Sequence, residues 1–177
     1  PFRDGVFDCI IISEVLEHLS DLDHKKSLRE ILRLAKKTII ISVPYEENLE
    51  ERICRCPRCG TCFHAYHHKR SYTPDLFKSC LKGFYRQKII LLGKENRPNS
   101  LLLRVRHRVG DYWYFENAVC PTCDFKFENL TPISLPITKK FIIRMVSTLN
   151  QVLKFLQGWR KMFKPIYMIM LFRKIDK

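Results

Sequence analysis

Two short cysteine motifs are the residues of this sequence whose chemistry is easiest to specify. Cys56 and Cys59 form a C-P-R-C motif followed by Gly60, and Cys120 and Cys123 repeat it as C-P-T-C. A C-x-x-C motif makes a tight turn that aims both thiolates at one point, and two such motifs complete a tetrahedral Cys₄ zinc site. The repeated motif favours structural zinc over a redox pair or unrelated core cysteines.

The separation of the two motifs, about sixty residues, is long for a zinc ribbon, but the entropy of closing a loop grows only slowly with its length. Other side chains near the first motif leave a second metal site as an open alternative. Its candidate ligands are Cys54, Cys62, His64 and His67. The two remaining cysteines, Cys9 and Cys80, lie in apolar patterns and are predicted to be core residues.

The composition indicates the class of protein and its cellular compartment. Apolar residues make up 46% of the 177 residues, enough for a packed core. The N-terminal segment does not resemble a signal peptide, and there is no apolar run of about 20 residues that would span a membrane. Eight cysteines without a secretory signal favour a reducing compartment, so the predicted location is cytoplasmic.

Polar side chains gather where the first apolar run ends. The run from Cys9 to Ile12 is typical of a parallel strand buried on both faces, and Ser13, Glu14, Glu17 and His18 follow it. Ligands of open parallel sheets bind beyond the carboxyl ends of the strands. Two roles are open for these residues: they bind a ligand, or they form the solvent-exposed start of a helix.

The remaining pattern predicts an α/β fold. Apolar runs predict strands at 38–43, 85–93, 101–106, 112–116 and 165–174. Helical spacing predicts helices at 24–35, with Asp21 or Asp23 as cap, from Thr73 to Gly83, and at 138–163.

Several segments together resemble the second half of a class I S-adenosylmethionine-dependent methyltransferase. They are "PFRDGVFDCIIISEVLEHL", "LREILRLAKKTIIISVPY" and, as a last strand, 165–174. The resemblance implies a Rossmann-like sheet of seven strands whose last strand is antiparallel. Residues 1–93 are expected to form the C-terminal part of this core, with the first zinc motif at 54–64.

The resemblance also implies roles for individual residues. Ser13, Glu14 and Val15 would lie beside the methionine end of S-adenosylmethionine, and His18 would face the acceptor as a catalytic base. His68 and Arg70 would line the substrate pocket. Methyl transfer is a displacement at a sulfonium carbon, so positioning can supply most of the rate and a base is not required.

The sequence departs from the family at the cofactor site. There are only six glycines, none in a G-x-G motif, so the glycine-rich turn that follows the first strand of such sheets has no counterpart. We expect a partial Rossmann-like sheet without its N-terminal strands, in a fragment that does not bind S-adenosylmethionine alone. Its methyl acceptor, whether a small molecule, a glycan or a lipid-linked compound, is not specified.

The C-terminal part is strongly basic. Thr138 to Lys177 contain ten lysines and arginines against one acid, within a chain of net charge +14. Segment 94–137 is expected to be an insert carrying the second zinc motif, and 138–177 a basic amphipathic helix plus the last strand. Helix 138–163 is either an ordinary domain helix or a peripheral membrane contact.

A zinc-ribbon module that binds nucleic acid is the alternative function. Tyr112, Trp113, Tyr114 and Phe115 would be its base-stacking residues. Their alternation as an ordinary strand makes nucleic acid the less favoured partner.

Overall fold

The computed structural model describes residues 2–96, 98–128, 136–156 and 163–175. They form two compact units, each described here by itself. The first comprises Pro1–Glu47, Lys69–Lys94 and Pro165–Lys177, and the second comprises Asn48–His68 and Glu95–Lys164. The chain thus enters the second unit twice, whereas the sequence predicted three consecutive segments.

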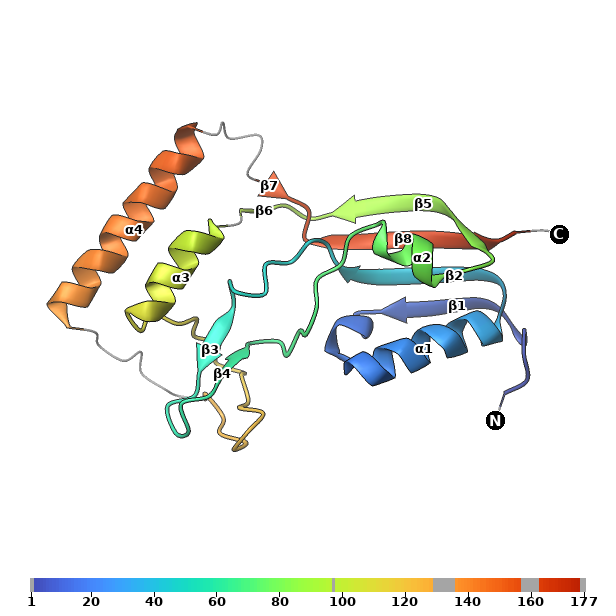
Figure 1. Cartoon of the computed structure of the whole chain (residues 1–177), viewed down its shortest axis with the longest axis horizontal. Helices are drawn as coiled ribbons and strands as arrows, with labels where there is room; N and C mark the ends of the chain where they lie inside the picture. The colour runs from blue at the N-terminus through green and yellow to red at the C-terminus, as the bar shows by residue number, and fades with distance from the viewer. Residues whose placement is uncertain (1, 97, 129–135, 157–162, 176–177) are drawn as a thin grey trace. The chain divides into compact units, whose positions relative to one another are not determined.

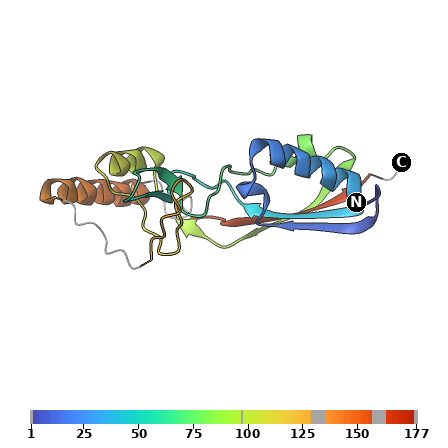
Figure 2. The same ribbon diagram turned by 90° about the horizontal axis from the view of Figure 1, so that it is seen from below.

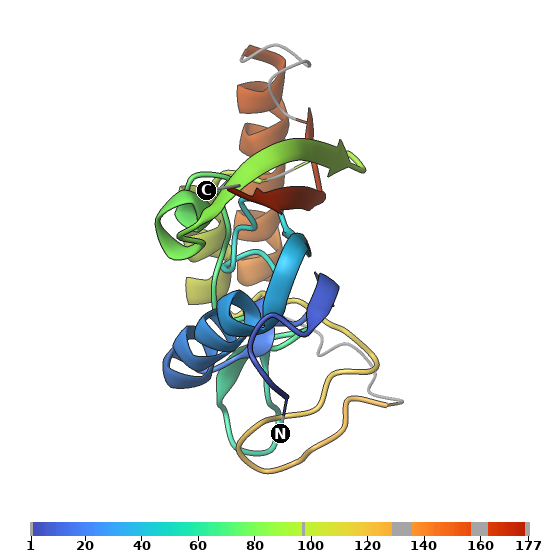
Figure 3. The same ribbon diagram turned by 90° about the vertical axis from the view of Figure 1, so that its right-hand side faces the viewer.

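A four-stranded sheet forms the centre of the first unit. Its strands, in spatial order, are β1 (Phe7–Ser13), β2 (Ala35–Pro44), β8 (Tyr167–Lys174) and β5 (Phe84–Leu92) (Figure 1). β1 and β2 are parallel, and β8 runs antiparallel to both of its neighbours. The predicted α/β class, and an antiparallel last strand, are therefore confirmed. Figure 3 shows the strands from their end, each rotated relative to the next as in other twisted sheets.

The helices of this unit cover one face of the sheet. η1 (Leu16–His18) and α1 (Asp21–Leu34) follow β1, and α2 (Leu76–Cys80) precedes β5. Figures 2 and 3 both show α1 and α2 on the same side of the strands. Under them lies the main core, a cluster of fully buried side chains that includes Ile39, Ile41, Phe77, Met170 and Phe172.

The helix boundaries differ from the predicted ones at their N-termini. Ser20 is the N-cap of α1, and its hydroxyl accepts a hydrogen bond from the Asp23 N–H at 3.1 Å. Asp23 instead accepts the Ser20 hydroxyl at 2.6 Å, so the aspartate supports the cap without being the cap. α2 has only five residues and begins after Asp75 rather than at Thr73.

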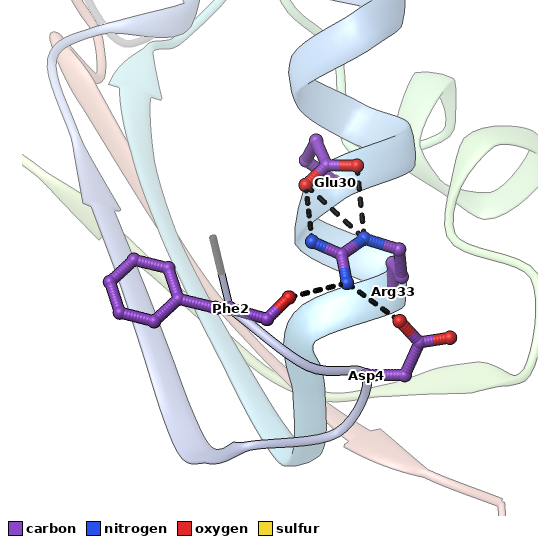
Figure 4. Close-up of polar contacts among 4 residues, drawn as sticks. All are labelled: Phe2, Asp4, Glu30 and Arg33. Atoms are coloured by element: carbon purple, nitrogen blue, oxygen red, sulfur yellow. Dashed lines mark hydrogen bonds and ion pairs between the residues drawn. The ribbon is translucent and has the colours of Figure 1, made fainter.

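Arg33 fastens the residues that precede β1 to the last turn of α1 (Figure 4). Its guanidinium donates to both carboxylate oxygens of Glu30, to Asp4 at 2.6 Å and to the Phe2 carbonyl at 2.9 Å. These bonds raise the pKa of Arg33 and lower that of Glu30. Because the groups are at the surface, their main effect is to fix the entry into β1.

The opposite face of the sheet is open among the described residues. Ile11 on β1 is 68% exposed, and Ile90 on β5 is 40% exposed. Cys9 also points to this face and is exposed, so its prediction as a core residue was wrong. Cys80 is half-buried and packs against the main core, in keeping with its prediction.

The second unit combines two short antiparallel strand pairs with two helices. Its elements are β3 (Ile53–Arg55), β4 (Cys62–His64), β6 (Glu95–Asn96), α3 (Ser100–Arg108), α4 (Ile137–Leu156) and β7 (Phe163–Lys164). β3 pairs antiparallel with β4, and β6 pairs antiparallel with β7. None of the described helices in either unit is long and apolar enough to cross a membrane.

Two predicted strands in this unit were wrong, and the predicted helix 138–163 is confirmed as α4 up to Leu156, with residues 157–162 outside the described part of the chain. Segment 101–106 is helix α3 instead of a strand, because Asn99 caps it by accepting the Leu101 N–H at 2.8 Å and leucine and arginine are good helix formers. Residues 112–116 are irregular, with Trp113 donating its N–H to the Ile53 carbonyl. The predicted helix 138–163 does not include Phe163, which belongs to β7.

The core under α2 gives a stability prediction. We expect Phe77→Ala to lower the free energy of unfolding by about 3–5 kcal/mol, because Phe77 is fully buried and truncation leaves a cavity. The matched control is Leu76→Ala, one residue earlier and 39% exposed, which should cost less than about 1 kcal/mol. Urea denaturation measures both, and equal losses would contradict the described packing of α2.

Candidate functional site

The carboxyl ends of the parallel strands β1 and β2 are neighbours in the sheet. The parallel register pairs Ser13 with Ser42, so the two strands end at the same edge of the sheet. Glu14, the first residue after β1, donates its N–H to the Ser42 carbonyl at 3.0 Å, and its carboxylate accepts the Ser42 hydroxyl at 2.8 Å. Ser42 therefore holds both the backbone and the side chain of Glu14.

Glu14 also has a left-handed backbone, with φ of 51°. This conformation is uncommon and costly for a residue with a side chain, and such outliers cluster at binding and catalytic sites. The two bonds to Ser42 supply the constraint that holds it. Val15, the next residue, is 46% exposed, so the chain turns outward at the end of β1.

Arg70 ties the segment after Glu14 to the residues that precede α2. Its guanidinium donates to the Leu16 carbonyl at 3.0 Å and to the Asp21 carboxylate at 2.6 Å. The neighbouring Lys69 N–H donates to the Glu17 carbonyl at 2.8 Å, and the Glu17 side chain is fully buried. The predicted substrate residue Arg70 thus lies next to the predicted cofactor segment, where it fixes the β1–α1 turn.

The predicted base, His18, is the last residue of η1. Its imidazole is 40% exposed, and Nε2 lies 4.0 Å from the Glu17 carboxylate. His18 is therefore accessible at the same turn as Glu14. Its role as a base stays a prediction.

His68, the second predicted substrate residue, belongs to the other unit. The His68 imidazole stacks on that of His64 with ring centroids 4.9 Å apart. The backbone N–H of His68 donates to His64 Nδ1 at 3.3 Å. Its substrate role also stays a prediction.

The sequence reading missed two residues that shape the strand end. Ser42 is one: it lies two residues before the end of β2, and only the parallel register, which periodicity does not reveal, places it beside Glu14. Tyr72 is the other: it is fully buried, stacks on Phe77 with ring centroids 5.3 Å apart, and has its pKa raised to about 12 by burial. It forms an apolar support beside Arg70 and carries no sequence signal of its own.

The four predicted metal ligands come together in the second unit. The sulfur atoms of Cys56, Cys59, Cys120 and Cys123 all lie within 4.8 Å of one another. The closest approaches join the two motifs, with 3.6 Å between Cys56 Sγ and Cys123 Sγ and 3.5 Å between Cys59 Sγ and Cys120 Sγ. Four thiols converging on one point could hold a metal ion.

The two motifs have the same backbone geometry. The N–H of Gly60 donates to the Cys56 carbonyl at 2.9 Å, and the N–H of Asp124 donates to the Cys120 carbonyl at 3.0 Å. Both residues are left-handed, with φ of 76° at Gly60 and 54° at Asp124. Aspartate tolerates this conformation better than most residues with a side chain, which explains how it replaces glycine in the second motif.

In the described part of the chain, three of the four candidates for a second metal site, Cys54, Cys62 and His67, do not assemble with other ligands, whereas His64 lies within 4.8 Å of another histidine, His68. Among the described residues, no group of three potential ligands includes Cys54, Cys62 or His67. Cys54 is fully buried in the same apolar cluster as Phe63 and Phe127, and burial raises its pKa to about 11. Its surroundings are those of a core residue.

A comparison with protein families bears on the first unit. Residues 1–41, which contain β1, Glu14, His18 and α1, match the family described as "Methyltransferase domain". This match covers 41 of the 177 residues. The resemblance predicted from the sequence is therefore confirmed, and Glu14 and His18 lie at the strand end of that methyltransferase segment.

Solved structures with a similar arrangement were also found. One is a SAM-dependent methyltransferase from Archaeoglobus fulgidus, 18% identical, with a TM-score of 0.47, covering 98% of this chain and 62% of that protein. The others are the [4+2]-cyclase SpnF, 13% identical, TM-score 0.43, covering all of this chain and 53% of that one, and YcgJ from Bacillus subtilis, 11% identical, TM-score 0.44, covering all of this chain and 68% of that one. The chain thus spans about three fifths of the first of these, and such distant likenesses do not define its activity. No protein with a curated function matches the sequence.

The backbone of Glu14 gives a second prediction. Glu14→Ala and Glu14→Gly both remove the carboxylate, but only glycine is unstrained at φ of 51°. We therefore expect the glycine variant to be more stable than the alanine variant by about 1 kcal/mol. Thermal and urea unfolding measure the difference. An alanine variant equal to or more stable than the glycine variant would show that residue 14 is not left-handed.

Proposed function

We propose that the domain to which this chain contributes transfers a methyl group from S-adenosylmethionine to a nucleophilic acceptor. The observation that carries the proposal is that the segment matching a methyltransferase domain includes a strained, doubly held glutamate at the end of a parallel strand. Binding residues of open parallel sheets occur at this edge. The anchored carboxylate of Glu14 is the group we expect to meet the methionine part of the cofactor.

The fit of the cofactor to this chain is partial. The strand end supplies an anchored carboxylate and the accessible Val15, but no glycine-rich turn occurs in the 177 residues. When bound, S-adenosylmethionine supplies an electrophilic methyl group on a positively charged sulfur. The described residues are suited to bind one end of that molecule and to orient it, and the remaining contacts must come from elsewhere.

The residues of this chain have distinct tasks in the proposal. Ser42 holds Glu14 so that its carboxylate is oriented before the cofactor arrives, which lowers the ordering cost of binding. Arg70 fixes the turn that presents His18. His18 would take the proton from a hydroxyl or amine acceptor, and the acceptor would be a small molecule, a glycan or a lipid-linked compound.

Cofactor binding tests this proposal. In the complete polypeptide that contains these residues, Glu14→Ala should weaken photo-crosslinking of radiolabelled S-adenosylmethionine roughly ten-fold or more, as expected for the loss of one charged contact. The control is Glu30→Ala, a surface glutamate on α1 that should leave labelling unchanged. Equal labelling of the wild type and Glu14→Ala would refute the role of the strand end.

The isolated chain is a further check on the same proposal. Calorimetric titration of residues 1–177 with S-adenosylmethionine should show no micromolar binding, because the glycine-rich turn is not among them. Micromolar binding would show that the strand end alone suffices.

We also propose that the cysteine cluster binds one structural zinc ion. Zinc–thiolate bonds of about 2.3 Å place the sulfurs of a tetrahedral site about 3.8 Å apart. The 3.5 Å and 3.6 Å approaches of the four thiols are close to this spacing, and the two motifs present them with matching turns. The ion would hold the two separate segments of the second unit together. It would supply no step of the reaction.

Zinc content tests the metal site. Protein purified without chelators should contain about one zinc per chain by elemental analysis. Cys120→Ser should reduce this to near zero and lower the unfolding temperature, because structural zinc contributes to folding. Cys80→Ser, which alters a thiol on α2 in the other unit, is the control and should retain the metal. Less than half an equivalent in the wild type would contradict the site.

The nucleic-acid alternative is not favoured by the structure. Tyr112 stacks on His107 with ring centroids 5.3 Å apart. The guanidinium of Arg55 also lies over the Tyr112 ring, 5.7 Å from its centroid. The Tyr114 hydroxyl donates to the Phe127 carbonyl at 3.0 Å. These aromatic side chains make contacts within the second unit instead of forming a row along a strand.

A further inference from the structure

The long helix α4 presents a mainly apolar surface to solvent, interrupted by Thr148. The outer residues of this surface recur every three or four positions, as on one side of a helix. They are Phe141 (63% exposed), Met145 (57%), Leu149 (48%), Val152 (47%), Phe155 (76%) and Leu156 (73%). We call these six residues the outer face of α4. Exposed apolar surface of this kind marks an interaction site.

The helix already has its packing partner on another side. Val146 is buried, and Ile143, Asn150 and Leu153 are half-buried. α4 lies beside α3 in the second unit (Figure 1), and Asn150 accepts the N–H of Asn99, which caps α3, at 3.4 Å. The outer face is therefore additional to what the helix needs for packing within its own unit.

The charge of α4 indicates what covers the outer face. Lys139, Lys140 and Arg144 lie on α4, and residues 137–156 contain no aspartate or glutamate. The whole chain carries a net charge of +14. A helix whose only charged residues are cations and which also has an exposed apolar face is complementary to an anionic lipid surface, where the apolar side chains enter the acyl boundary and the cations meet the headgroups.

A second copy of the helix fits this face less well. A symmetric pair brings the same surface of both helices together, so the cations beside one outer face would meet those of the other. With no acid on α4, such a pair would have no compensating charge and would be destabilised. An anionic membrane supplies that charge from outside the protein.

From these observations we infer that α4 binds the surface of anionic membranes, lying in the plane of the interface with its outer face inserted. Its twenty residues give a binding surface about 30 Å long. The helix lies on the membrane and does not cross it, in keeping with its hydropathy. This inference does not depend on the proposed methyl transfer.

Vesicle co-sedimentation of the full chain tests the inference. The protein should partition onto vesicles of 70% phosphatidylcholine and 30% phosphatidylserine roughly ten-fold or more better than onto pure phosphatidylcholine. High salt should reduce partitioning onto the anionic vesicles, because screening weakens the attraction of the cations. Equal partitioning onto both vesicle types, or none onto either, would overturn the inference.

Two pairs of matched variants separate the apolar and cationic parts. Phe141→Ser with Phe155→Ser should reduce partitioning roughly ten-fold or more. The control is Leu22→Ser with Leu101→Ser, two leucines on α1 and α3 that are 60% and 68% exposed, and it should partition like the wild type. Circular dichroism verifies that both pairs remain folded. Equal losses in the two pairs would overturn the assignment to α4.

The cationic part is tested in the same way. Lys139→Gln with Arg144→Gln should weaken binding about 25-fold, or about five-fold for each cation removed near the membrane surface. The control, Lys82→Gln with Lys126→Gln, removes the same net charge from exposed sites away from α4 and should lose far less. Equal losses would assign the binding to net charge and overturn the role of α4.

Sedimentation equilibrium distinguishes a second copy as the occupant. The wild type should be monomeric at the concentrations used with vesicles. A dimer that Phe141→Ser with Phe155→Ser dissociates, without partitioning onto anionic vesicles, would assign the outer face to self-association and overturn the inference.

Discussion

The parallel pairing of β1 with β2 is the constraint on which the candidate site depends. It sets Ser13 against Ser42, and so places the hydroxyl and carbonyl of Ser42 where Glu14 can use both. Side chains alternate between the faces of a strand, so a slip of one residue would turn Ser42 to the other face. Glu14 would then lose the donor to its carboxylate and one of the bonds that hold its left-handed backbone. The register therefore determines the site geometry before any ligand is present.

The sequence predicted the parts of this arrangement that are local. The runs of isoleucine predicted the strands β1 and β2, although not the open face of β1, and the polar residues after β1 predicted a strand end. The bond between Ser42 and Glu14 joins residues 28 positions apart, and it exists only because of the register. Periodicity within a strand carries no information on which partner residue lies opposite, and this is why Ser42 was missed.

The second unit shows the same division between local and distant information. The left-handed turns at Gly60 and Asp124 are set by the C-x-x-C motifs themselves, so four ligands could be predicted. The meeting of the two motifs is not local, because it depends on two segments that are far apart in the sequence. It brings Cys56 to Cys123 and Cys59 to Cys120. Segment 101–106 was predicted wrongly because its leucines and valine suit either a helix or a strand, and the cap at Asn99 decided for the helix.

The exposed face of β1 also depends on elements that lie far from it in the sequence. Its apolar residues occupy both faces of the strand, a pattern typical of parallel strands covered on both sides. Ile10 and Ile12 pack against the main core under α1, whereas Ile11 between them is 68% exposed. Apolar residues on both faces of a strand allow both faces to be buried, but the neighbouring elements determine which faces are covered. Among the described residues the helices cover one face, so the hydrogen bonds of β1 to β2, and not burial of both faces, fix its place at the edge of this sheet.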